Sequence, residues 1–200
     1  MSQARKLLAI MAFAIVAGST APASATTLVR QSLENLVADN GVIVVGEVIG
    51  KHSYWNEGGT FILTDLTIET REVLKGKVAA SEITVTIPGG TVGDLSTLIV
   101  DGAELAEGRS YVLFLDRKSF LGVKDVLTVD DHAQGVFEVV QDKGKGGLRA
   151  VSQASKTRLV PDVFGESAAP GKAEGLAFDK MKQSVREIAG RAQSPRQEVK

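Results

Sequence analysis

Hydrophobic and polar positions along most of this chain follow the repeat of β-strands. The run VIVVGEVI at 42–49 is almost continuously apolar and β-branched, which is typical of a strand buried on both faces. In TFILTDLTIET, at 60–70, apolar side chains alternate with polar ones, which predicts a strand with one buried face. Shorter candidates follow between turns rich in Gly, Asp and Lys: EITVTI, STLIV, SYVLFLD, DVLTV, GVFEVV and LRAVS. Many short strands at this spacing predict an all-β barrel or sandwich.

Two segments have a helical pattern instead. SLENLVADN, before the first strand, predicts a short helix. Near the C-terminus, Phe178, Met181, Val185 and Ile188 are spaced 3-4-3, which predicts an amphipathic helix over 173–190 that packs on the barrel or caps one end. The turn-rich stretch 161–172 is expected to be a linker, and 191–200, which has no apolar anchor, a mobile tail.

The first 25 residues have the organisation of a secretory signal peptide. Arg5 and Lys6 precede an apolar run at 7–17, and Ala23-Ser24-Ala25 is a small-x-small cleavage pattern. The run is too short to cross about 30 Å of hydrocarbon, and no later stretch is apolar enough, so no membrane span is expected. We therefore predict cleavage near Ala25, a secreted or periplasmic protein, and one barrel domain over 26–160.

The charge balance bears on the choice of partner. Loss of Arg5 and Lys6 with the signal peptide reduces the 23 basic side chains to 21, against 24 acidic ones, a net charge of about −3. Nucleic acids and anionic membranes are bound by basic surfaces, so neither is expected as a partner. The chain has no cysteine, so its hydrophobic core must stabilise it without disulfides.

Catalytic motifs are absent from the sequence. It contains no HExxH, no G-x-S-x-G, no cysteine nucleophile and no phosphate-binding loop of the required form. No cofactor is expected, and an enzyme is the minority hypothesis. Its best candidate centre is Asp130, Asp131 and His132, near Asp125, whose oxygen and imidazole ligands suit a divalent cation. The alternative is a solvated acidic turn at the end of a strand.

The candidate binding residues come from two predicted loops. One is KHSYWNEGGT, after the first strand, where rigid amphipathic aromatic side chains could contact a partner. The other is the PGG turn, whose backbone N–H groups could face a ligand. The candidates are His52, Tyr54, Trp55, Asn56, Gly89 and Gly90. Alternatively, the aromatic side chains cover the barrel core and the glycines serve only the turn.

Several segments together resemble the netrin-like module, the OB-type barrel shared with tissue inhibitors of metalloproteinases. The matching residues are Asp39 with 42–48, the long strand and its E-V-L-K-G end at 64–76, and G-x-S-Y-V-L-F-L at 108–115. The chain is also similar to uncharacterised secreted bacterial proteins with the same run at 64–76, the PGG turn at 88–90 and A-Q-G-x-F-x-V at 133–139. The likeness covers roughly 33–160 and concerns fold more than function.

The resemblance implies an OB-like (netrin-like) β-barrel with a short N-terminal helix and a C-terminal amphipathic helix. Those inhibitors coordinate the protease's zinc through an N-terminal cysteine, which this chain lacks, so that mechanism does not carry over. In L-K-G, Gly76 is expected to permit the reversal of the backbone, and Lys75 to keep the turn solvated without a chemical role.

These observations favour a secreted or periplasmic, non-enzymatic module that binds a protein, with an extracellular protease as one candidate partner. The contact surface would be the loop at 51–59 and the PGG turn. One alternative is a metal-dependent hydrolase centred on Asp130, Asp131 and His132. The other is a structural, envelope-associated component that docks through its C-terminal helix.

Overall fold

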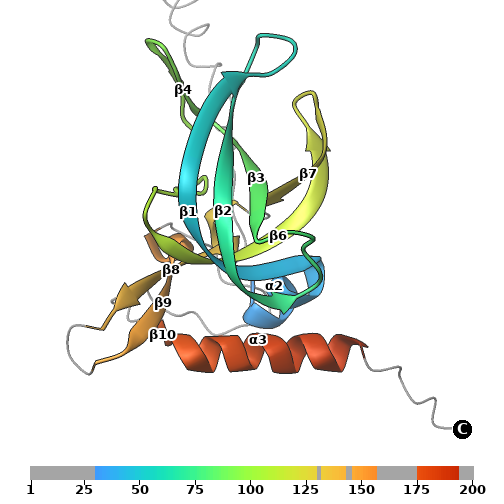
Figure 1. Cartoon of the computed structure of the whole chain (residues 1–200), viewed down its shortest axis with the longest axis vertical. Coiled ribbons are helices and arrows are strands. Elements are labelled where there is room, and N and C mark those ends of the chain that lie inside the picture. The colour runs from blue at the N-terminus through green and yellow to red at the C-terminus, as the bar shows by residue number, and fades with distance from the viewer. Residues whose placement is uncertain (1–29, 130–131, 143–145, 157–174, 194–200) are drawn as a thin grey trace, which may run out of the picture.

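The computed structural model describes residues 30–129, 132–142, 146–156 and 175–193. They form a mainly β chain with two α-helices, as the hydrophobic pattern predicts: α2 (Leu33–Asp39) precedes the strands and α3 (Phe178–Gln193) follows them (Figure 1). The predicted signal peptide at 1–25 and linker at 161–172 lie outside the described residues. Helix α3 begins five residues after the predicted start at 173 and includes the first three residues of the predicted tail at 191–200.

The strands account for most of the remaining described chain. In order they are β1 (Val42–Trp55), β2 (Ile62–Lys75), β3 (Glu82–Pro88), β4 (Gly90–Val92), β5 (Leu95–Thr97), β6 (Ser110–Phe120), β7 (Val123–Val129), β8 (Val136–Gln141), β9 (Leu148–Ser152) and β10 (Leu176–Ala177). Two 3₁₀ helices, η1 (His132–Gly135) and η2 (Gln153–Lys156), follow β7 and β9.

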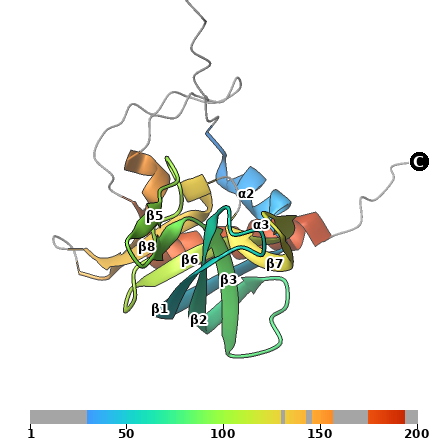
Figure 2. The same ribbon diagram turned by 90° about the horizontal axis from the view of Figure 1, so that it is seen from above.

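Five strands close into a ring, which we call the barrel. Its order is β1-β2-β3-β7-β6, and β6 returns to pair with the first half of β1. Strands β3 and β7 run parallel and meet at Val85 and Leu127, whereas the other neighbours in the ring are antiparallel. Strands β8, β9 and β10 extend the sheet from β6, and β4 and β5 form a separate two-stranded hairpin (Figure 2).

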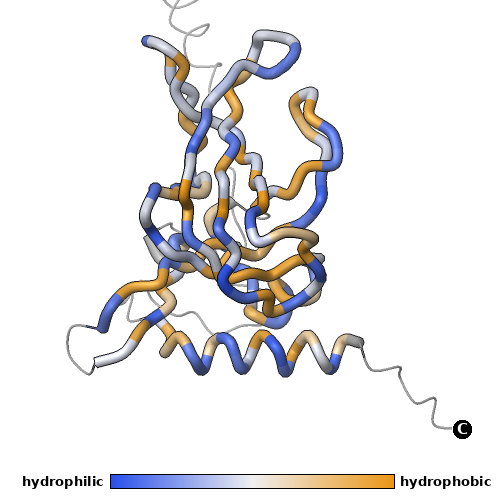
Figure 3. The backbone as a smooth tube through the Cα atoms, in the orientation of Figure 1, coloured by the Kyte–Doolittle hydropathy of each residue, from blue (hydrophilic) through white to orange (hydrophobic). Residues whose placement is uncertain are grey.

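The hydrophobic residues form two packed groups. One fills the barrel and includes Val44, Leu66, Leu113 and Leu115, each fully buried. The other lies between the barrel and the two helices and includes Ile43 and Phe114. The alternation of hydrophobic and hydrophilic positions that produces these two layers can be followed along the strands in Figure 3.

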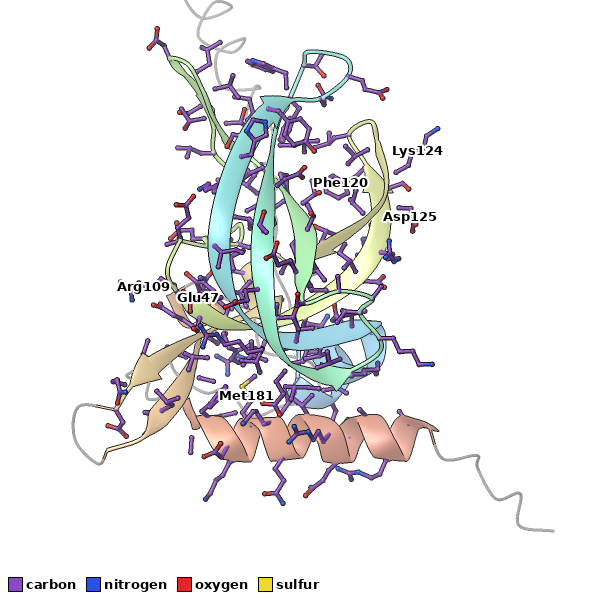
Figure 4. The ribbon with its side chains drawn as sticks, in the orientation of Figure 1. Glu47, Arg109, Phe120, Lys124, Asp125 and Met181 are labelled. Atoms are coloured by element: carbon purple, nitrogen blue, oxygen red, sulfur yellow. The ribbon has the colours of Figure 1, made fainter. Side chains whose placement is uncertain are left out.

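Helix α3 uses its apolar stripe within the chain. Met181 and Val185 are fully buried, and Figure 4 shows Met181 directed from the helix toward the strands. Lys182 and Arg186 both pair with Glu72 on β2, with Lys182 Nζ 3.2 Å from the carboxylate. The face that the sequence predicts to be apolar therefore packs against the barrel.

Lys75 differs from its expected role as a solvated turn residue. Its ammonium group donates hydrogen bonds to the carbonyl oxygens of Val37, Asn40 (2.7 Å) and Ala38 (3.3 Å), at the C-terminal end of α2. The Asn40 side chain donates to the Leu36 carbonyl oxygen at 2.9 Å. Lys75 thus caps the short helix, since the last carbonyls of a helix have no partners within it.

Two features of the structure favour glycine at position 76. Its φ is +80°, where side chains other than glycine are strained. A Cβ atom at this position would lie 2.4 Å from the Gly41 carbonyl oxygen, in the segment that joins α2 to β1. Lys75 and Gly76 together hold the end of β2 against the first helix.

Candidate functional site

The predicted binding loop at 51–59 is mostly strand. Strand β1 continues to Trp55 and pairs with β2 up to Ile62, so the connecting turn covers only 56–61. Successive residues of a strand point to opposite faces, so Trp55 lies on one face of β1 and His52 and Tyr54 on the other. The expectation of a loop is wrong because Gly50–Trp55 find continuous partners in β2, which outweighs the polar composition of the segment.

The Asn56 side chain is engaged within the chain. Its Oδ1 accepts hydrogen bonds from the N–H groups of Thr60 (2.9 Å) and Phe61 (3.1 Å), which closes the β1–β2 turn. Its Nδ2 donates to the Leu121 carbonyl oxygen at 3.0 Å. Asn56 therefore ties the tip of the β1–β2 hairpin to the tip of the β6–β7 hairpin.

Tyr54 belongs to a polar cluster on the outer face of β1, β2 and β3. Its ring stacks near-parallel with His52, at 5.9 Å between centroids. Its hydroxyl group donates to Asp65 Oδ1 at 3.1 Å, and Thr86 donates to the same oxygen at 2.7 Å. Burial raises the pKa of Tyr54 above 10.0, and the negative charge of Asp65 raises it further.

This cluster borders a cavity of about 470 Å³, which we call the β3–β7 recess. Tyr54, Asp65 and Thr86 line one side, and residues of the β6–β7 hairpin, including Arg117 and Leu127, line the other. Figure 4 shows Phe120 on the inner side of that hairpin and Asp125 on its outer side.

Gly89 and Gly90 line a second cavity, of about 420 Å³, which we call the β4–β5 recess. A Cβ atom on Gly90 would lie 2.2 Å from Thr64 Oγ1 and 2.6 Å from Ser53 Oγ, so only glycine fits above these hydroxyl groups. Thr64 in turn donates to the Gly89 carbonyl oxygen at 2.6 Å. The PGG turn thus allows the chain to cross closely over β1 and β2 and forms a wall of the recess.

Charged groups of both signs surround the β4–β5 recess. Lys51 and Glu104 line it, and Arg109 pairs with Glu138 at 2.7 Å. Tyr111 also lines the recess, and its hydroxyl oxygen accepts a hydrogen bond from the N–H group of Ala106 at 3.1 Å. Burial raises the pKa of Tyr111 above 10.0.

An exposed apolar segment, residues 95–100, adjoins this recess. Leu95 is 61%, Leu98 89% and Val100 83% exposed, and Leu98 and Ile99 line the cavity. The sequence predicts a strand at STLIV, but β5 ends at Thr97 and the next three residues leave the sheet. The sequence does contain an indication of this: the apolar run follows directly after the Gly-Asp turn at 93–94, a few residues after the two glycines of the PGG turn. Strand propensity alone does not show that such a run leaves the sheet.

The candidate metal centre falls largely outside the described residues. Asp130 and Asp131 are not described, and His132 is described only as the first residue of η1. Asp125 is described: its carboxylate pairs with Arg117 at 3.3 Å and is 78% exposed. Across the described part of the chain, no three His, Cys, Asp or Glu side chains gather in a way that could hold a metal ion.

The structure divides the predicted binding residues between two places. His52 and Tyr54 belong to the cluster beside the β3–β7 recess, whereas Gly89 and Gly90 line the β4–β5 recess. No protein-family model matches the chain, and neither does any curated protein. None of the helices in the described ranges is both long and apolar enough to cross a membrane.

Proposed function

We propose that this chain is an OB-type, netrin-like barrel that acts in the periplasm or outside the cell and binds another protein without catalysing a reaction. The ring order supports the fold assignment, since an OB barrel is a five-stranded, partly open Greek-key barrel. The signal-peptide pattern at 1–25 supports the location. The fold assignment, the location and the binding function are three parts of one proposal.

The observation that carries the binding function is the exposure of Leu95, Leu98 and Val100 beside the β4–β5 recess. Three large apolar side chains within six residues, each more than 60% exposed, cost solvation free energy in the free protein. Contiguous apolar patches next to a recess are typical of protein-interaction sites. Single exposed hydrophobic residues elsewhere, such as Leu148 at 42%, have no such neighbours in sequence.

The segment is held at both of its ends. Its first three residues are β5, which pairs with β4 as a hairpin. After it, the Gln153 side chain bonds both backbone groups of Glu104, with Oε1 accepting from the Glu104 N–H group at 3.0 Å. Because the chain is fixed on either side, little conformational entropy is lost when the apolar side chains are covered. This favours a preorganised binding surface over a frayed loop.

The recess indicates what kind of partner fits. An extended segment of another protein could place apolar side chains on Leu98 and Val100, while Lys51 and Glu104 on the rim pair with charges of either sign. An extracellular protease is the candidate that the family resemblance supplies. Binding would have to be independent of a zinc-coordinating cysteine, because the chain has none.

Site-specific crosslinking tests this proposal. A photoreactive residue at position 98 should crosslink to one protein of the periplasm or culture medium, which mass spectrometry then identifies. The purified partner should bind the unmodified chain, and Leu98→Ser with Val100→Thr should weaken binding at least tenfold. Leu148→Ser, an exposed leucine on β9, is the matched control and should bind normally.

Two results would contradict the assignment. One is equal binding of the Leu98/Val100 variant and the unmodified protein. The other is loss of binding in the double variant Tyr54→Ala, Trp55→Ala while the Leu98/Val100 variant still binds, which would move the contact surface to the far part of β1. A partner that proves to be a protease should also be assayed for a change in its activity.

A further inference from the structure

Asp65 is a partly buried carboxylate that neutral groups hold in place. Tyr54 and Thr86 donate to the same oxygen, Oδ1, at 3.1 and 2.7 Å. Thr86 lies directly opposite Asp65 across the β2–β3 pair, and His52 lies opposite it on β1. In the ranges that the structure describes, no lysine, arginine or histidine forms an ion pair with this carboxylate, so its negative charge has no cationic partner there.

The other charges around the β3–β7 recess leave that negative charge available. Arg117 is occupied by Asp125, with Nη1 2.8 Å from the Asp125 carbonyl oxygen and 3.3 Å from its carboxylate. Lys77 and Glu82 also line the recess and are both exposed. A carboxylate that is partly removed from water gains most from a partner of opposite charge.

The aromatic surface beside Asp65 favours a particular cation. The rings of His52 and Tyr54 lie near-parallel, with 15° between their planes, and Tyr54 reaches across to the carboxylate. A guanidinium group is planar, stacks on aromatic rings and pairs with carboxylates, whereas an ammonium group is a compact and strongly hydrated charge. A divalent metal ion would need more oxygen ligands than one carboxylate provides.

We propose that the β3–β7 recess binds an arginine side chain of a partner protein, with Asp65 pairing with the guanidinium group and Tyr54 packing against it. Tyr54 and Thr86 both donate to Oδ1, so the second oxygen, Oδ2, takes part in neither of these hydrogen bonds. The site lies on other strands than the 95–100 segment. It can therefore be tested independently of the proposed protein-binding surface.

The test uses blocked arginine, N-acetyl-arginine amide, which represents an arginine within a polypeptide. Addition to the purified protein should shift the backbone amide NMR signals of Tyr54, Asp65 and Thr86, with a Kd of about 1–10 mM, as expected for one side chain. The citrulline analogue has the same shape without the charge and should bind at least tenfold more weakly. N-acetyl-lysine amide should also bind more weakly than the arginine probe.

Variants separate a specific site from general attraction to a negative surface. Asp65→Asn keeps an oxygen acceptor for Tyr54 and Thr86 but removes the charge, and should weaken binding of the arginine probe about tenfold or more. Glu69→Gln removes a charge from the same strand, away from the recess, and should leave the Kd unchanged. Tyr54→Phe should weaken binding less than Asp65→Asn does, because the ring remains.

The proposal is overturned if the citrulline analogue binds as well as the arginine probe, or if Asp65→Asn leaves the Kd unchanged. It is also overturned if the arginine probe produces no NMR shifts at roughly 50 mM, which is 50 times the lower limit of the expected Kd. Free arginine is the last probe, and its Kd is compared with that of the blocked form. Binding of free arginine ten times tighter than of the blocked form would make the ligand a small molecule and overturn the assignment to a partner protein.

Discussion

Replacement of Lys75 by methionine is expected to destabilise the protein by about 2–3 kcal/mol. The ammonium group donates to three carbonyl oxygens at the end of α2, among them Asn40 at 2.7 Å. Hydrogen bonds to charged groups contribute roughly 1.5–3 kcal/mol, and a cation at a helix C-terminus adds about 0.3–1 kcal/mol. Methionine keeps the length and the apolar stem of the side chain, so the loss reports the capping interactions.

Urea unfolding followed by circular dichroism measures this effect. With an m-value of about 2 kcal/mol/M, the midpoint should fall by roughly 1 M without a change in slope. Hydrogen exchange should quicken in α2 before it quickens in β1. Lys77→Met is the matched control, since Lys77 lies two residues further on and is exposed, and its midpoint should stay within about 0.3 M of the unmodified protein.

The capping role of Lys75 would be refuted by a urea midpoint of Lys75→Met that equals that of the unmodified protein. It would also be refuted by an equal fall in both variants, because that would show a general dependence on basic charge in this turn. Lys75→Arg offers a further check. A guanidinium group can still donate to carbonyl oxygens, so this variant should recover part of the lost stability.

Three further outcomes follow from the packing. Gly76→Ala should lower the free energy of unfolding, measured from urea midpoints, by about 3 kcal/mol or more. Gly59→Ala, with φ +61° and no atom within 4 Å of the added Cβ, should lower it by about 1 kcal/mol. Equal losses would contradict the close approach of Gly76 to Gly41. Met181→Ala should cost about 2–5 kcal/mol, because this side chain is fully buried under α3, and the exposed Gln183→Ala about 0.5 kcal/mol or less. Burial raises the pKa of Tyr54 and of Tyr111 in the folded protein, so the unfolded chain loses these two protons at a lower pH. The free energy of unfolding should therefore decrease as the pH rises above about 10. An ultraviolet titration that gives ordinary tyrosine pKa values in the folded protein would contradict this.

The mainly β chain and its two helices follow from local patterns. Alternation in 60–70 fixes which side chains of β2 face the barrel, and the 3-4-3 spacing in α3 fixes its buried stripe. These features could be predicted because each depends on neighbours a few residues apart. The length of β1 could not be predicted in this way, since residues 50–55 become strand only through their pairing with β2.

The candidate site could be predicted only in part, for a similar reason. The aromatic side chain of Tyr54 is evident in the sequence, but the carboxylate that it bonds is 11 residues away on the next strand. Glycines at 89 and 90 predict a turn, yet their closeness to Thr64 and Ser53 depends on how β4 crosses the barrel. The sequence does not predict the exposure of Leu98, because an apolar residue in a short apolar run is expected to be buried.

The cap on α2 also has a consequence for the order of folding. A helix of seven residues is too short to be stable alone in water, and its C-terminal partner, Lys75, lies 38 residues beyond Val37 in the chain. The helix should therefore become protected only after β1 and β2 have paired and delivered the end of β2 to it. Among the described helices and strands, the one that comes first in the sequence would thus be among the last to become stable.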